Sequence, residues 1–195
     1  STWQPGDVWP DGHTLTIPRD AASGPYKLEV SFYYPETLEL LGQPVTVDYI
    51  VVRSEESPSA SVMAPVAYGD GIALTAAELP GQPWEPGEEA AVRLTWQAET
   101  AERGRYTTFV HMVGPNGLVA QFDQEPFGGF FPTSDWLAGV PVTDVYPLEL
   151  PDDLPAGEYQ LFAGLYEPAT GQRLSWLDHG AAAGDAYPFA TIQVR

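Results

Sequence analysis

The chain has 195 residues, with 8 Lys and Arg against 27 Asp and Glu, so its formal net charge is −19. Charge of this sign repels phosphate backbones and anionic membrane surfaces, so we expect no nucleic-acid partner. Cysteine is absent, which excludes disulfides, thiolate metal sites and cysteine nucleophiles. The hydrophobic content of 44% is enough for a packed core. Because no apolar run approaches the ~18 residues of a membrane span, we also expect no membrane insertion by this chain.

The first part of the chain repeats the last part. Residues 1–41 match residues 134–174 without a gap at fourteen identical positions, and IVVR at 50–53 resembles IQVR at 192–195. A repeat of this kind indicates two copies of one structural unit. Because residue 1 aligns with residue 134, inside the later unit, we expect the chain to begin partway through a unit. Residues 1–53 are therefore predicted to form only the C-terminal half of a unit.

A half unit would expose an apolar face. This face would be carried by Leu15, Ile17, Leu28, Val30 and Phe32. Such a face needs a cover of protein. Three covers are open: a preceding segment that has been cut away, a second copy in a homodimer or strand exchange, or the complete unit itself. We favour pairing across chains or packing against the complete unit.

The complete unit is predicted over residues 66–195, after a linker at 54–65 that is rich in Ser, Pro and Glu. Short stretches of alternating apolar and polar residues, separated by Gly and Pro, indicate β-structure throughout. The segments GPNG at 114–117 and EPATGQ at 167–172 are typical of hairpin turns. The predicted fold class is an all-β antiparallel sandwich, one complete unit preceded by a partial repeat. Its strands are expected near 66–75, 89–98, 105–113, 118–123, 142–150, 158–166, 173–176 and 187–194.

One tyrosine resembles the tyrosine corner of immunoglobulin-like and fibronectin type III sandwiches. Tyr159 follows Gly157 by two residues and opens a strand after a turn that contains proline. In those sandwiches the hydroxyl bonds back to the backbone and fixes the corner; the alternative is a plain core tyrosine. Trp136 recurs as Trp3, which indicates packing. We therefore assign structural roles to Tyr159, Tyr26, Trp3, Gly157 and Gly24.

The order of motifs resembles one family. YTTFVHMVGPNGLVAQFDQEP at 106–126, then TSDW at 133–136, DVYPLELP at 144–151 and GLYEPATGQRL at 164–174, is similar to β-sandwich domains at the C-terminus of polytopic membrane glycosyltransferases. These enzymes are of the protein-mannosyltransferase type in Chloroflexi-like bacteria. The resemblance implies an extracytoplasmic, non-catalytic appendage and supplies no established binding residues. The first copy departs from the pattern, with Ser31 in place of Gly164 and residues 38–40 in place of 171–173.

No arrangement typical of catalysis stands out. The histidines are His13, His111 and His179, and His111 lies mid-strand in FVHMV, as expected for a core or half-buried side chain. The sequence contains no nucleophile elbow, zinc-protease motif or phosphate-binding glycine loop. We therefore expect that the chain is not an enzyme. A hydrolase with an unrecognised carboxylate site is the remaining enzymatic alternative.

The segment DQEPFGGFFPTSDW at 123–136 is the candidate ligand site. Aromatic rings beside carboxylates and amides are what a sugar needs, since its C–H face stacks on rings and its hydroxyls need polar partners. End-capping of the sandwich by the same rings is the alternative. The candidate residues are Phe127, Phe130, Phe131, Trp136, Asp123 and Asp135.

No cofactor is expected, although a structural Ca²⁺ remains an alternative because oxygen ligands are plentiful. Asp144 and its repeat mate Asp11 are explained more simply by a hydrogen bond at a turn or strand end. These observations predict an extracytoplasmic, non-catalytic module that acts as a spacer or interaction domain beside a membrane glycosyltransferase, with a glycan or a cell-surface protein as partner. The alternatives are an independent carbohydrate-binding module and, third, the hydrolase.

Overall fold

A computed structural model describes residues 12–18, 21, 24–52, 61–101 and 103–195. The described chain is all-β, which confirms the predicted fold class, an antiparallel β-sandwich. Trp3 and Asp11 lie outside the described residues. No helix in the described part of the chain is long and apolar enough to cross a membrane. The strands are β1 (Gly24–Val30), β2 (Val45–Val52), β3 (Ser61–Tyr68), β4 (Ile72–Glu78), β5 (Glu89–Ala98), β6 (Thr107–Gly114), β7 (Gly117–Gln124), β8 (Pro141–Glu149), β9 (Gly157–Tyr166), β10 (Trp176–Asp178), β11 (Ala181–Gly184) and β12 (Tyr187–Val194).

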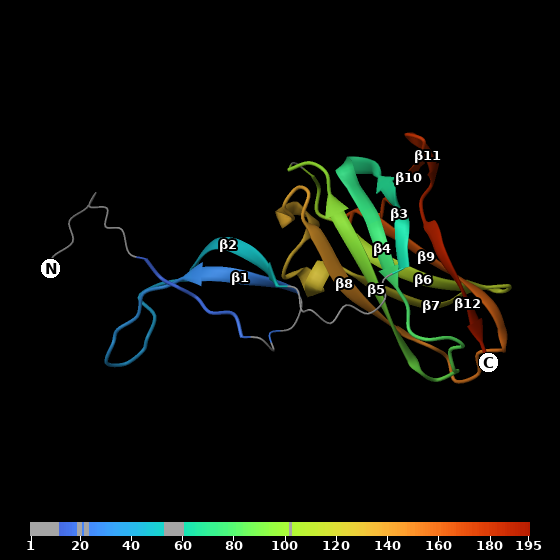
Figure 1. The fold of residues 1–195 in the computed structure, drawn as a ribbon, viewed down its shortest axis with the longest axis horizontal. Coiled ribbons are helices and arrows are strands. Elements are labelled where there is room, and N and C mark those ends of the chain that lie inside the picture. Colours follow the sequence, from blue (N-terminus) through green and yellow to red (C-terminus); the bar gives the residue numbers. More distant parts are fainter. Residues whose placement is uncertain (1–11, 19–20, 22–23, 53–60, 102) are drawn as a thin grey trace.

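Two sheets form the sandwich, and a separate two-stranded hairpin of β1 and β2 lies beside it (Figure 1). One sheet has the order β11-β10-β3-β4-β5-β8 and the other the order β12-β9-β6-β7. Side chains along β5 and β8 are alternately buried and more exposed, because successive residues of a strand point to opposite faces. Each sheet therefore contributes one apolar face to the interior.

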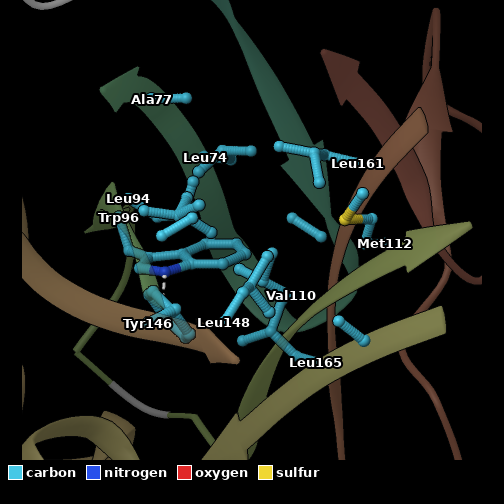
Figure 2. Close-up of a cluster of buried hydrophobic side chains, with 14 of the residues drawn as sticks. Leu74, Ala77, Leu94, Trp96, Val110, Met112, Tyr146, Leu148, Leu161 and Leu165 are labelled. Carbon is cyan, nitrogen blue, oxygen red and sulfur yellow. Dashed lines mark hydrogen bonds between the residues drawn. The ribbon is translucent and has the colours of Figure 1, made fainter. Parts of the chain in front are cut away.

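The core between the sheets is closely packed, and Figure 2 shows the hydrogen bond between Trp96 and Tyr146 within it. Trp96 Nε1 donates to the hydroxyl of Tyr146 at 3.0 Å, and this hydroxyl donates to Thr108 Oγ1 at 2.8 Å. Burial raises the pKa of Tyr146, so the phenol stays protonated and able to donate. Because both polar groups of these large rings are paired, they occupy the interior without an unsatisfied donor.

The structure confirms both predicted turns and the bond expected of the tyrosine corner. Gly117 and Gly171 have φ values of 109° and 71°, in the region that favours glycine. Tyr159 donates its hydroxyl proton to the carbonyl of Pro155 at 2.8 Å. The likeness to immunoglobulin and fibronectin type III domains as such stays a prediction.

Three of the predicted boundaries are wrong. Residues 66–75 form two strands instead of one, because the turn η1 (Gly69–Gly71) reverses the chain with Asp70 at φ 59°. The strand β3 begins at Ser61, inside the predicted linker, while residues 53–60 lie outside the described range. The strand expected at 173–176 is β10, which starts at Trp176, and β11 was not predicted at all. Small residues are frequent at 61–65, where β3 begins, and at 181–184, which form β11, so the alternation that marks a strand is weak in both segments.

The repeat is visible in the hydrogen bonds of both copies. Gly24 pairs with Val52 in the hairpin, as Gly157 pairs with Val194 in the complete unit. The turns that follow β1 and β9 also agree. The amide of residue 34 bonds to the carbonyl of residue 39 as 167 does to 172, and 41 bonds to 32 as 174 does to 165. The hairpin of β1 and β2 is thus the counterpart of the β9–β12 pair.

Candidate functional site

The segment 123–136 contributes much of its aromatic surface to the core. Phe131 and Trp136 are only 1% and 2% exposed, and Trp136 Nε1 donates to the carbonyl of Phe131 at 3.0 Å. Phe127 is half-buried and packs against the same core. Phe130, at 44% exposure, has the most exposed ring of the segment. Packing of the sandwich end therefore accounts for Phe131 and Trp136, whose rings have no exposed face for a sugar.

The hairpin of β1 and β2 contacts the surface that this segment does present. The Tyr49 ring lies 4.8 Å from that of Phe131, and its hydroxyl donates to Asp135 Oδ2 at 3.3 Å. The Lys27 ammonium lies 5.0 Å from the centre of the Phe130 ring. Desolvation and the neighbouring Asp135 raise the pKa of Tyr49. The side of the hairpin that carries Lys27 and Tyr49 thus packs on the complete unit, and Asp135 of the segment faces it. The apolar face that was expected to be covered is not the side in contact, because Val30 and Phe32 are 50% and 65% exposed.

Asp144 is the buried acid of this end of the sandwich. Its carboxylate accepts hydrogen bonds from the backbone amides of Phe127 and Val145, both at 2.9 Å, and from Gln124 Nε2 at 3.0 Å. This confirms the hydrogen-bonding role expected for Asp144. Burial raises the pKa of this carboxyl even so. Within the described ranges, no group of three or more acidic or histidine side chains is placed to hold a metal ion.

A second cluster lies on the outer face of the four-stranded sheet, away from the core. His111 on β6 is directly opposite Phe162 on β9, and Phe109 is opposite Gly164, so these positions share one face. Tyr166 and Asp123 continue the same face on β9 and β7. We call this surface the aromatic face. It is formed by Phe109, His111, Asp123, Phe162, Tyr166 and Arg173.

Three rings of the aromatic face pack against one another at tilted angles, with Phe109 in contact with both His111 and Tyr166. The Phe109 ring lies 4.4 Å from that of His111 and 6.3 Å from that of Tyr166, measured between centres. The Arg173 guanidinium covers it at 4.6 Å. Phe109 is fully buried although it lies outside the main core, because Gly164 has no side chain and a Cβ there would overlap its ring. Phe162, Tyr166 and His111 are half-buried and reach the surface.

Polar groups pair around these rings. His111 Nε2 lies 3.1 Å from Asp123 Oδ1, and Arg173 Nη1 lies 3.8 Å from Asp185 Oδ1. Burial lowers the pKa of His111 in spite of Asp123, which acts in the opposite direction. The imidazole is therefore neutral at pH 7, half-buried as predicted and hydrogen-bonded to Asp123. The arrangement offers aromatic edges and faces together with planar donors and acceptors.

The sequence pattern singles out His111 and Asp123 but does not place them on one surface. Their partners come from β9 and from the turn after it, about fifty residues away along the chain. The available signal was the alternation in β6 and β9, which puts Phe109 and His111 on one side and Phe162 and Tyr166 on one side. What alternation does not give is which strands pair.

Comparison with known proteins finds similarity among solved structures. No protein-family model matches the chain, and no curated protein matches it. A solved structure that is similar is the C-terminal domain of Wzt, at 14% sequence identity and a TM-score of 0.43. The match covers 71% of this chain and 80% of that one. At this level of similarity the function of this chain has to be argued from its own residues.

Proposed function

We propose that the chain is a non-catalytic glycan-contacting module, and that the aromatic face binds a neutral sugar. The observation that carries this proposal is that the half-buried Phe162 and Tyr166 lie on the same face as two pairs of polar side chains, His111 with Asp123 and Arg173 with Asp185. Strands hold all but Arg173 and Asp185 of these residues, so little ordering is required when a ligand binds.

The chemistry of the face favours an uncharged sugar. A pyranose presents C–H groups on its faces and hydroxyls around its edge, which match a ring such as Phe162 beside carboxylate, imidazole and guanidinium groups. His111 is neutral and Arg173 is already close to Asp185, so neither offers an uncompensated positive charge to an acidic sugar. The net charge of −19 adds a repulsive field for anions.

The broader setting rests on the resemblance of residues 106–174 to appendages of membrane glycosyltransferases. Within that setting the module lies outside the cytoplasm beside such an enzyme. It acts there as a spacer or as an interaction domain that contacts glycan. The contact of Tyr49 and Lys27 with the segment 123–136 supports an interaction role for that segment, with protein as the partner. A sugar site on Phe130 stays a prediction.

The test is a titration of ¹⁵N-labelled protein with neutral manno-, gluco- and galacto-oligosaccharides, with a uronic-acid oligosaccharide in parallel. We expect saturable shifts at His111, Phe162 and Tyr166 with at least one neutral sugar and none with the acidic one. Phe162→Ala should weaken binding at least about tenfold, or about 1.4 kcal/mol, because the stacking surface is lost.

The matched control is Leu118→Ala. Leu118 is a 52% exposed apolar residue of β7 in the same sheet, outside the aromatic face, so this change should leave affinity within about twofold of the original. The absence of shifts with every neutral sugar would refute the proposal. Shifts confined to Phe130 would move the site to the segment 123–136, and release of reducing sugar would favour the hydrolase.

A further inference from the structure

The half unit has an open edge where the complete unit has a paired one. In the complete unit β9 pairs with β12 on one side and with β6 on the other. Its counterpart β1 pairs with β2 on one side, and no strand within the described ranges pairs with its other side. A row of backbone donors and acceptors at such an edge is a template for another strand.

Among the described residues, no sheet of this chain opposes the other side of the β1–β2 hairpin. The side of the hairpin that carries Lys27 and Tyr49 packs on the segment 123–136, whereas Leu28 and Val30 belong to the opposite side. Val30 and the nearby Phe32 are 50% and 65% exposed, while their counterparts Ala163 and Leu165 are fully buried. In the complete unit residues 66–133 provide β6, which pairs with β9, and β4 and β5 of the six-stranded sheet that covers β9.

We propose that the hairpin of β1 and β2 is a docking surface for one kind of partner, a β-sandwich half-unit with the strand pattern of residues 66–133. Such a partner adds a strand like β6 to the open edge of β1 and lays a second sheet over Leu28, Val30 and Phe32. The β9–β6 pairing is the template for the added strand, and the packing of the six-stranded sheet on β9 is the template for the cover, because the two copies share their register and turn bonds residue by residue.

The hairpin also specifies how this partner differs from residues 66–133. Val30 and Phe32 are larger than Ala163 and Leu165, so the partner must have smaller side chains opposite them. Ser31 replaces Gly164, on which the Phe109 ring lies, so the partner has no ring at the position of Phe109. These three differences mean that the half unit accepts a relative of residues 66–133 in preference to an identical copy.

The experiment fuses a second copy of residues 66–133 directly before Ser1 of the full chain. This junction reproduces the natural sequence step from Thr133 to Ser134, since residue 134 is also serine. A second fusion carries Val30→Ala, Ser31→Gly and Phe32→Leu, which restore the residues of the complete unit. The readouts are hydrogen exchange of the β1 amides and binding of the dye ANS, which reports exposed apolar surface.

We expect the second fusion to slow exchange of the β1 amides at least about 100-fold relative to the original chain, and to reduce ANS binding. The first fusion should give a smaller effect because its packing is strained. The matched control is the second fusion with Val110→Asp and Met112→Asp in the added segment only, which should exchange like the original chain. Unchanged exchange in both fusions would overturn the proposal. So would a dimer of the original chain in which the β1 amides are protected, because the occupant is then a second copy.

Discussion

The β1–β2 hairpin and the β9–β12 pair form the same backbone structure in two different surroundings. Both have the same strand register, and the turns that follow them have the same hydrogen bonds. Yet Leu161 is fully buried between two sheets, whereas Leu28 is partly exposed. The complete unit contacts the hairpin on the side of Tyr49, and Leu28 belongs to the other side. Local sequence is therefore enough to specify the hairpin, while burial depends on strands that are remote in the chain.

The two copies also differ where the aromatic face is built. Phe162, Gly164 and Arg173 correspond to Glu29, Ser31 and Leu40. In the first copy, Glu29 therefore lacks the ring of Phe162, and Leu40 lacks the guanidinium that covers the Phe109 ring. Ser31 has a side chain where Gly164 leaves space for that ring. The proposed sugar site therefore belongs to the complete unit alone, and the half unit retains only the framework of the fold.

The largest expected difference between the copies is in the cost of truncating equivalent leucines. Leu161→Ala should lower the free energy of unfolding by about 2–5 kcal/mol, because it opens a cavity in a closed core. Leu28→Ala should cost less, about 1 kcal/mol, because Leu28 is already partly exposed and its truncation opens no cavity in a closed core. Urea unfolding followed by tryptophan fluorescence measures both. Equal losses would show that the half unit is buried in solution.

A second test exchanges the residues that separate the two faces. Gly164→Ser should destabilise the complete unit by about 1–3 kcal/mol, because its Cβ overlaps the Phe109 ring and must displace it. The reverse change, Ser31→Gly, should alter stability by less than about 1 kcal/mol. The NMR signals of His111, which lies against Phe109, should shift in the first variant and stay unchanged in the second. Unshifted His111 signals in Gly164→Ser would show that the Phe109 ring does not lie over Gly164 and against His111.

How much the sequence could predict follows from the range of each interaction. The two turns and the hydrogen bond of Tyr159 depend on residues only a few positions apart, and the structure confirms them. The repeat can be seen by aligning the sequence with itself, and both copies have the same turn bonds. The split of residues 66–75 was missed because a three-residue turn in a run of small and apolar residues does not disturb the apolar pattern. The aromatic face was missed because it depends on the pairing of β6 with β9, which alternation along one strand does not specify.

The turns after β1 and β9 provide a third comparison of medium size. Leu38 has φ 60° at the position where the other copy has Gly171 at 71°, and this region is unfavourable for a residue with a Cβ. Leu38→Gly should therefore stabilise the first turn by about 1 kcal/mol. Gly171→Leu should destabilise the second by about 1–2 kcal/mol, and a Cβ there meets no other atom, so backbone strain alone is tested. Hydrogen exchange of the Leu41 and Leu174 amides, which close the turns, measures both. Slower exchange of Leu174 in Gly171→Leu would contradict this reading.

The smallest expected effect is the pH dependence that His111 gives to the complete unit. Burial lowers the pKa of this imidazole below the value of about 6.5 that it has in the unfolded chain. Between the folded pKa and about 6.5 the unfolded chain binds more protons, so this group makes stability rise with pH and fall on acidification. Asp144 has a raised pKa and acts with the opposite sign above its ordinary value near 3.8. Subtracting the pH profile of His111→Gln from that of the original chain cancels Asp144 and leaves the imidazole. A flat difference would mean that burial and the His111–Asp123 contact cancel, and a slope of the opposite sign would mean that the contact outweighs burial and favours the imidazolium; either result contradicts the prediction.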